Sequence, residues 1–165
     1  SYPVEDRTVT GACRDLPAEA PGVVTVSAGG PPQPQSDYSS YGQGVVDVTA
    51  PGGDTRFRTG GTASTPSDGI LSTTWNPATH VDGYGYKQGT SMAGPHAAGV
   101  AALALSAHPG MNPGQLASFL ERTATPLACP VGVYEPRPGY PATCTGGERN
   151  SFYGAGNVNA LNVVQ

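Results

Sequence analysis

The feature that most constrains this chain is a serine placed between a glycine turn and a long run of small apolar residues. Residues 89–107 read GTSMAGPHAAGVAALALSA. The alanine-rich run favours a helix, and Pro95 is tolerated because it falls in the first turn, where its missing N–H is not needed. The small side chains, with Gly94 and Gly99, allow close packing. The sequence therefore predicts a helix over Ser91–Ala107 that is buried on all sides.

The start of this predicted helix suits a nucleophile. Unpaired N–H groups and the positive end of the helix dipole would stabilise an oxyanion formed by attack of Ser91 on a carbonyl. Small neighbours such as Gly89 leave room for a substrate backbone. A serine at a helix start is more often only an N-cap, so the residues alone leave both interpretations open.

The rest of the chain alternates strand and helix signals. Val23–Ala28 and Val45–Thr49 are β-branched runs bounded by turn residues, and their continuous apolar character favours a parallel sheet covered on both faces. Ile70–Lys87 predicts a hairpin that leads into Gly89. The pattern thus indicates an α/β fold.

Two further helices are predicted towards the end of the sequence. One begins with Asn112 as N-cap and Pro113 in its first position, and it stops before Pro126. A short final helix is predicted over Asn159–Val164. The 24 Gly and 17 Pro cluster between the apolar runs, which is typical of an ordered, turn-rich domain.

Charge and hydropathy exclude several classes of function. The net charge is −4 and no basic run occurs, which argues against nucleic acid or an anionic membrane as a partner. The longest strongly apolar stretch, Val100–Leu105, is too short to span a bilayer. Residues 1–3 do not begin a signal peptide, so we expect either a mature fragment or a signal further upstream.

The three cysteines favour an oxidising compartment. Cys129 and Cys144 bracket a Pro/Gly-rich stretch without helical or strand period, which is the setting for a loop-closing disulfide. Two free thiols are the alternative. If Cys129 and Cys144 are joined, Cys13 is left unpaired or is bonded to another segment.

Four segments together resemble one protein family. The stretch GTSMAGPHAAGVAAL is similar to the nucleophile signature of the subtilisin-like serine proteases. The runs PGVVTVSA, SDYSSYGQGVVDVTAPGG and FYGAGNVNALNVV resemble further family segments and occur in the family's order. The resemblance implies a three-layer α/β fold with a mainly parallel sheet, and residues 1–165 would be the carboxy-terminal portion of one peptidase domain. It makes Ser91 the nucleophile, with Gly89 and Thr90 beside the substrate.

The family's other catalytic groups are not found in this sequence. Its aspartate sits in Asp-Ser/Thr-Gly, its base in His-Gly-Thr and its oxyanion asparagine in Ala-x-Gly-Asn, and none of these motifs occurs here. His80, His96 and His108 each lie in contexts that do not suit the base. We therefore expect an amino-terminal segment to carry the Asp, His and Asn. The chain could be a fragment, a nicked enzyme, or one of two separate chains.

The resemblance also bears on metals and on what the chain acts on. Asp47 aligns with a family aspartate near a weak cation site, and the family commonly binds structural calcium, although a strand residue bonded to a neighbouring turn is an equal alternative. No cofactor is expected for catalysis. A secreted endopeptidase acting on peptides or proteins is the leading hypothesis. The alternative is an inert fragment or pseudoenzyme that binds a peptide or a partner.

Overall fold

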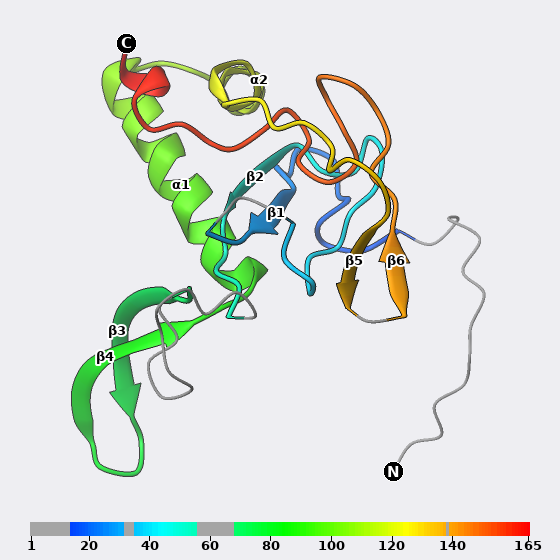
Figure 1. Ribbon diagram of the computed structural model, residues 1–165. Helices are drawn as coiled ribbons and strands as arrows, with labels where there is room; N and C mark the ends of the chain where they lie inside the picture. Colours follow the sequence, from blue (N-terminus) through cyan, green and yellow to red (C-terminus); the bar gives the residue numbers. More distant parts are fainter. Residues whose placement is uncertain (1–13, 32–34, 56–67, 138) are drawn as a thin grey trace.

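The computed structural model describes residues 14–31, 35–55, 68–137 and 139–165 (Figure 1). The serine-bearing helix α1 spans Thr90–Ala107, which confirms its prediction. Helix α2 spans Pro113–Thr123 and begins with a capping box. In it the Asn112 side chain accepts from Gln115 N at 2.9 Å, and the Gln115 side chain accepts from Asn112 N at 2.9 Å. These bonds satisfy N–H groups that the first helical turn leaves unpaired.

Two short strands form the parallel pair that the sequence predicted. Strand β1 is Val26–Gly29 and β2 is Val48–Pro51, with Val26 opposite Val48. Both begin later than predicted. Just before them, the Asp47 carboxylate accepts from Thr25 N at 2.8 Å, so a side chain takes part in the pairing there.

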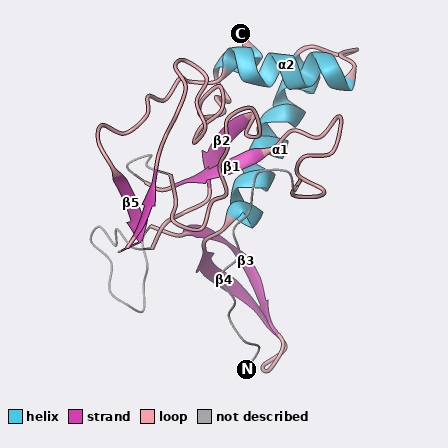
Figure 2. Ribbon diagram, turned by 90° about the vertical axis from the view of Figure 1, so that its right-hand side faces the viewer, coloured by secondary structure: helices cyan, strands magenta, loops and turns pink. Residues whose placement is uncertain are grey.

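The predicted hairpin is confirmed and projects from the rest of the molecule (Figures 1 and 2). Strand β3, Ile70–Asn76, pairs antiparallel with β4, Val81–Lys87, along their full lengths. A smaller pair that the sequence did not predict joins β5, Tyr134–Arg137, to β6, Tyr140–Ala142. The predicted final helix is reduced to the 3₁₀ turn Asn162–Val164.

Helix α1 packs along one face of the β1–β2 pair and contacts α2 near its carboxyl end (Figure 2). One buried cluster joins the start of α1 to the strands; its members are Ala28, Ala50, Ala93 and Ala97. A second joins the end of α1 to α2 and the 3₁₀ turn; its members are Val100, Ala104, Leu120 and Val163. Alanine at these positions brings the helix close to the sheet.

The prediction that α1 is buried on all sides is wrong for the part of the chain that the structure describes. Only Ala93, Ala97, Val100 and Ala104 are buried along the helix. The opposite face is exposed, and Leu103 and Leu105 keep 45% and 40% of their surface accessible. The sequence indicated small, closely packable residues all round, but the described residues supply packing partners for only one face. No helix in the described ranges is long and apolar enough to cross a membrane.

Candidate active site

Ser91 is the second residue of α1 and is exposed, as is Thr90. The N-cap Gly89 has φ 149°, a conformation that favours glycine, and its carbonyl accepts from Met92 N at 2.9 Å. Neither the hydroxyl nor the N–H of Ser91 has a hydrogen-bond partner among the described residues. A nucleophile and an oxyanion donor are therefore both available at this helix start.

The glycine turn before Ser91 rests on the end of β2. Gly89 N donates to the Gly52 carbonyl at 2.9 Å, and Gly52 N donates to the Gly29 carbonyl at 3.0 Å. A Cβ on Gly52 would lie 2.5 Å from Ala28 Cβ and 2.9 Å from Gly89 O, so only glycine fits. Gly52 thus couples the ends of both strands to the turn that delivers Ser91.

Gly53, the residue after Gly52, is held in place by two hydroxyl groups. The Tyr38 hydroxyl donates to the Gly53 carbonyl, and the Ser36 hydroxyl donates to the same oxygen at 3.1 Å. Burial raises the pKa of Tyr38 above its ordinary value, so the phenol remains a donor at neutral pH. Neither was predicted as a site residue, although both lie in the segment SDYSSYG that carried the family resemblance.

The described histidines and Ser91 are not brought together. His80 lies in the hairpin turn and stacks on Trp75, with ring centroids 5.9 Å apart. His96 Nδ1 is 2.8 Å from the Met92 carbonyl, and His108 Nε2 is 3.1 Å from the Val163 carbonyl beyond the other end of α1. None of the three hydrogen-bonds to Ser91, so among the described residues no histidine is placed as a base for the Ser91 hydroxyl.

A hollow of about 340 Å³ lies beside the exposed side of α1. Val24 and Val26 line it from the β1 side, Ala98 and Ala101 from α1, and Leu116 from α2. Among the described residues, no strand other than β2 pairs with β1. The second edge of β1 is occupied at Ala28, whose N–H donates to Ser39 Oγ at 3.0 Å and whose carbonyl accepts from Ser36 N at 3.0 Å. Only the Val26 end of that edge has no described strand beside it. The apolar hollow, the Val26 end of the second β1 edge and an exposed helix face therefore adjoin one another.

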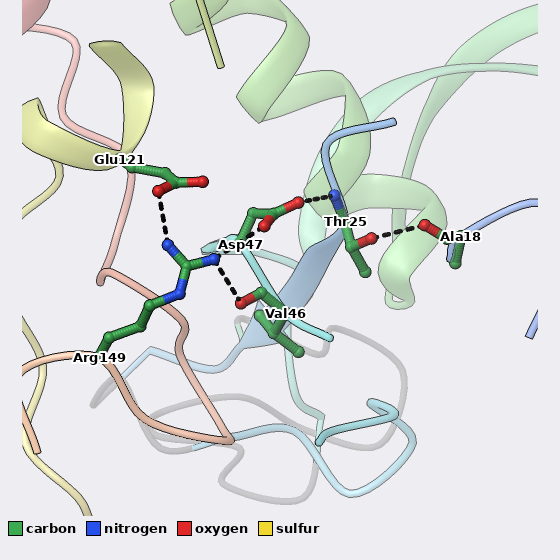
Figure 3. A network of polar contacts seen from close by, with 6 residues as sticks. All are labelled: Ala18, Thr25, Val46, Asp47, Glu121 and Arg149. Carbon is green, nitrogen blue, oxygen red and sulfur yellow. Dashed lines mark hydrogen bonds and ion pairs between the residues drawn. The ribbon is translucent and has the colours of Figure 1, made fainter. Parts of the chain in front are cut away.

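Asp47 belongs to an ion-pair network (Figure 3). Its Oδ1 is 2.8 Å from the Arg149 guanidinium, which also contacts Glu121 Oε2 at 2.5 Å, while its Oδ2 accepts from Thr25 N. Burial lowers the pKa of Arg149, but the bond to Glu121 and the charges of Glu121 and Asp47 outweigh it and raise that pKa. The network ties α2 and the loop carrying Arg149 to the segment before β2.

The surroundings of Asp47 do not fit a calcium ion. Calcium needs six to eight oxygen ligands, whereas both Asp47 oxygens already accept hydrogen bonds from nitrogen donors. No group of three or more His, Cys, Asp or Glu side chains within the described ranges could hold a metal. The guanidinium of Arg149 supplies the positive charge that the sequence led us to expect from a metal ion.

The predicted disulfide is present. Cys129 and Cys144 are joined, with their Cα atoms 5.5 Å apart. Cys144 packs against the buried cluster that contains Phe152 and Tyr153. The bridge therefore fixes the loop that carries β5 and β6 to the body of the molecule, away from Ser91. Cys13 lies outside the described residues.

Comparison with known proteins settles the family. The model of the subtilase peptidase family matches residues 7–156. The chain belongs to the subtilase family. An extracellular protease of Xanthomonas campestris is 35% identical over 149 residues, a match that covers 88% of this chain and 20% of that protein. Subtilisin NAT of Bacillus subtilis subsp. natto is 37% identical over 111 residues, covering 67% of this chain and 24% of that protein.

The solved structures agree with this assignment. A protease from Pseudoalteromonas arctica has 36% sequence identity and a TM-score of 0.67, over 90% of this chain and 37% of that one. The subtilase fold predicted from the sequence is therefore confirmed for this α/β portion. The chain spans about a fifth to a quarter of the two protease sequences named above.

Proposed function

We propose that this chain is the nucleophile-bearing, carboxy-terminal portion of a secreted subtilase that hydrolyses peptide bonds in peptides or proteins. The observation that carries the proposal is the exposed Ser91 at the start of α1, on a glycine turn anchored to Gly52. The proteases to which the chain is similar support the reaction class.

In the proposed reaction Ser91 Oγ attacks the scissile carbonyl carbon. An O–C bond forms, the hydroxyl proton passes to a histidine on another segment, and the carbonyl oxygen becomes an oxyanion near the N–H of Ser91. The C–N bond then breaks, and the histidine gives its proton to the leaving amine. In the second half of the reaction, water attacks the acyl carbon while the histidine takes its proton. The bond between that carbon and Ser91 Oγ then breaks, and the histidine returns the proton to Ser91 Oγ. Gly89 and Thr90 flank the bound substrate, and no cofactor takes part.

The histidine, its aspartate and the oxyanion asparagine are proposed to lie on an amino-terminal segment of the same protease. The surface that would receive this segment is the exposed face of α1, the Val26 end of the second β1 edge and the hollow between them. Covering it would remove apolar side chains such as Leu103 from water, which stabilises association. Without that segment, we expect the chain to be inactive.

Secretion is proposed on two grounds. Similar proteins are named extracellular proteases, and the Cys129–Cys144 bridge is typical of oxidising compartments.

The alternative is an inert binding module, and hydrolysis by the full-length protein separates the two. Full-length protein should cleave a chromogenic peptide, and Ser91→Ala should lower kcat by about 10⁶-fold, because the nucleophile of a triad acts as a unit with its base. Ser118→Ala, at an exposed serine of α2, is the matched control and should retain activity. Cleavage that survives Ser91→Ala would contradict the assignment, and no cleavage by wild type would favour the inert module.

A further inference from the structure

The β3–β4 hairpin presents two very different faces. Antiparallel partners share a face, so the register places Leu71 with Tyr86 and Trp75 with Asp82 on one side, where Tyr84 also lies. The opposite side carries no aromatic residue; its pairs are Ile70 with Lys87, Ser72 with Gly85, Thr74 with Gly83 and Asn76 with Val81. Aromatic side chains are therefore concentrated on a single face of a ribbon that projects from the molecule (Figure 1).

This aromatic face is open to solvent. Trp75 is 54% exposed and Tyr84 is 79% exposed. Together with Asp82 and Thr73, and with the Thr74–Gly83 pair that lies between them along the strands, they line a hollow of about 470 Å³. The imidazole of His80 stacks on Trp75 at an interplanar angle of 25° and steadies the indole from the turn. The hollow is thus bordered by two aromatic rings and a carboxylate.

Asp82 is available for a ligand. No hydrogen bond or ion pair engages its carboxylate among the described residues. Lys87 is the other charged residue of the hairpin, and the register places it on the opposite face, paired with Ile70. The aromatic face therefore carries one negative charge and no described positive charge of its own strands.

We propose that this hollow binds a basic side chain, arginine or lysine, of the protein substrate. A guanidinium or ammonium group is attracted to the faces of Trp75 and Tyr84 and to the charge of Asp82. The chain's net charge of −4 favours the approach of a basic segment. The proposal rests on the proposed function, which supplies the substrate.

Continuity with the nucleophile connects the hollow to the substrate. Strand β4 carries Asp82 near its start and ends at Lys87, and Gly89 then caps the helix that bears Ser91. Tyr84 and Asp82 precede Ser91 by seven and nine residues, so at about 3.3 Å per extended residue the hollow lies at most about 30 Å from Ser91. A protein substrate is long enough to reach both places at once.

The first test is a titration followed by tryptophan fluorescence. Trp75 is the single tryptophan of this sequence, and subtracting the spectrum of Trp75→Phe removes emission from any tryptophan elsewhere in the full-length protein. Acetyl-arginine amide at low salt should change Trp75 emission saturably. Acetyl-citrulline amide, which has nearly the same shape without the charge, should not. An equal response to both amides would overturn the proposal.

Variants separate the hollow from a general charge effect. Asp82→Asn and Tyr84→Leu should each weaken binding of the arginine amide about three- to tenfold. Glu135→Gln, an exposed carboxylate on β5, is the matched control and should bind like wild type. Unchanged affinity in Asp82→Asn, with its melting temperature preserved, would contradict the role of the hollow.

The second test asks whether the ligand belongs to a substrate. For the full-length protease, KM for an arginine-rich protein should rise about three- to tenfold when that protein is citrullinated, and this difference should disappear in Asp82→Asn. Equal KM values in wild type would refute the substrate assignment. Wild-type cleavage of a short chromogenic peptide shows that the protease is active. If that cleavage fails, the proposed function fails, while the titration still decides whether the hollow binds a cation.

Discussion

The two faces of α1 are built from similar residues and have opposite surroundings. On one face, Ala93 and Ala104 are fully buried against the strands and α2. On the other, Ala98 and Ala102 are exposed, and Leu103 keeps 45% of its surface accessible. Residue type alone therefore does not decide burial, because a helix face is buried only where the chain supplies a partner for it. The exposed face is where we propose that an amino-terminal catalytic segment binds.

The same substitution, alanine to aspartate, should change the free energy of unfolding very differently on the two faces of α1. Ala104→Asp puts an unpaired carboxylate into a buried cluster and should lower the free energy of unfolding by several kcal/mol. Ala102→Asp changes an exposed residue and should shift it by no more than about 0.5 kcal/mol in the 165-residue chain. Urea unfolding measures both.

The effect of Ala102→Asp on stability should differ between the 165-residue chain and the full-length protein. There, Ala102→Asp should become strongly destabilising, because the proposed amino-terminal segment covers the face. If Ala102→Asp is as mild in the full-length protein as in the 165-residue chain, the exposed face is not the one that receives the segment.

Removing the disulfide should lower the stability of the fold without changing the difference between the effects of Ala104→Asp and Ala102→Asp. Replacing both Cys129 and Cys144 by serine opens a loop whose closure stabilises the fold by about 3 kcal/mol, mainly by restricting the unfolded chain. Thermal unfolding with and without reductant checks this value. Because the bridge lies away from α1, a changed ratio between the Ala104→Asp and Ala102→Asp effects would show that the two regions are coupled.

Arg149 holds α2, which covers the buried face, to the segment before β2. Arg149→Met should lower the free energy of unfolding by about 1 kcal/mol, a modest loss because the guanidinium is partly exposed and screened by water. Arg149→Lys keeps the charge but not the two-sided contact, so it should lose less. Chemical unfolding distinguishes these variants, and an unchanged stability of Arg149→Met would show that the network contributes nothing.

Tyr38 provides the smallest predicted effect, and it depends on pH. Its folded-state pKa is raised above the ordinary value of 10.0, first by burial and also by the charges of Asp54 and Asp37. The folded state therefore holds this proton more tightly than the unfolded state, so the stabilisation is complete below pH 10 and declines as the pH rises above it.

Tyr38→Phe should therefore lose less stability than wild type between neutral pH and pH 11. Tyr140→Phe, at a residue that is 72% exposed, should follow the wild-type profile. Parallel curves for Tyr38→Phe and wild type would mean that the buried phenol does not titrate as described.

The sequence predicted the elements around Ser91 well and their surroundings less well. Helix α1, the Asn112 cap and the hairpin follow from local signals, namely small-residue runs, capping residues and turn residues, and all three are confirmed. Tyr38 and Gly52 could not be found in this way. Their importance arises from contacts between segments far apart in the chain, which no local pattern encodes.

Asp47 is a second case in which a contact with a distant segment could not be predicted from the local sequence. The resemblance indicated a weak cation site beside it, with a hydrogen-bonded strand residue as an equal alternative. In the structure its carboxylate accepts from Thr25 N and from Arg149, which is 102 residues away in the sequence. Local sequence reveals that a carboxylate needs a positive partner. It does not reveal whether that partner is an ion or a distant side chain.

The most direct test of the central claim is labelling by a fluorophosphonate probe, with the modified residue mapped by mass spectrometry. We predict that Ser91 is labelled in the full-length protein, and that the 165-residue chain alone is not labelled because it lacks the base that activates the hydroxyl. Labelling of the isolated chain at a comparable rate would contradict the claim that the catalytic base lies on another segment. Labelling of the full-length protein at a different serine would contradict the assignment of Ser91 itself.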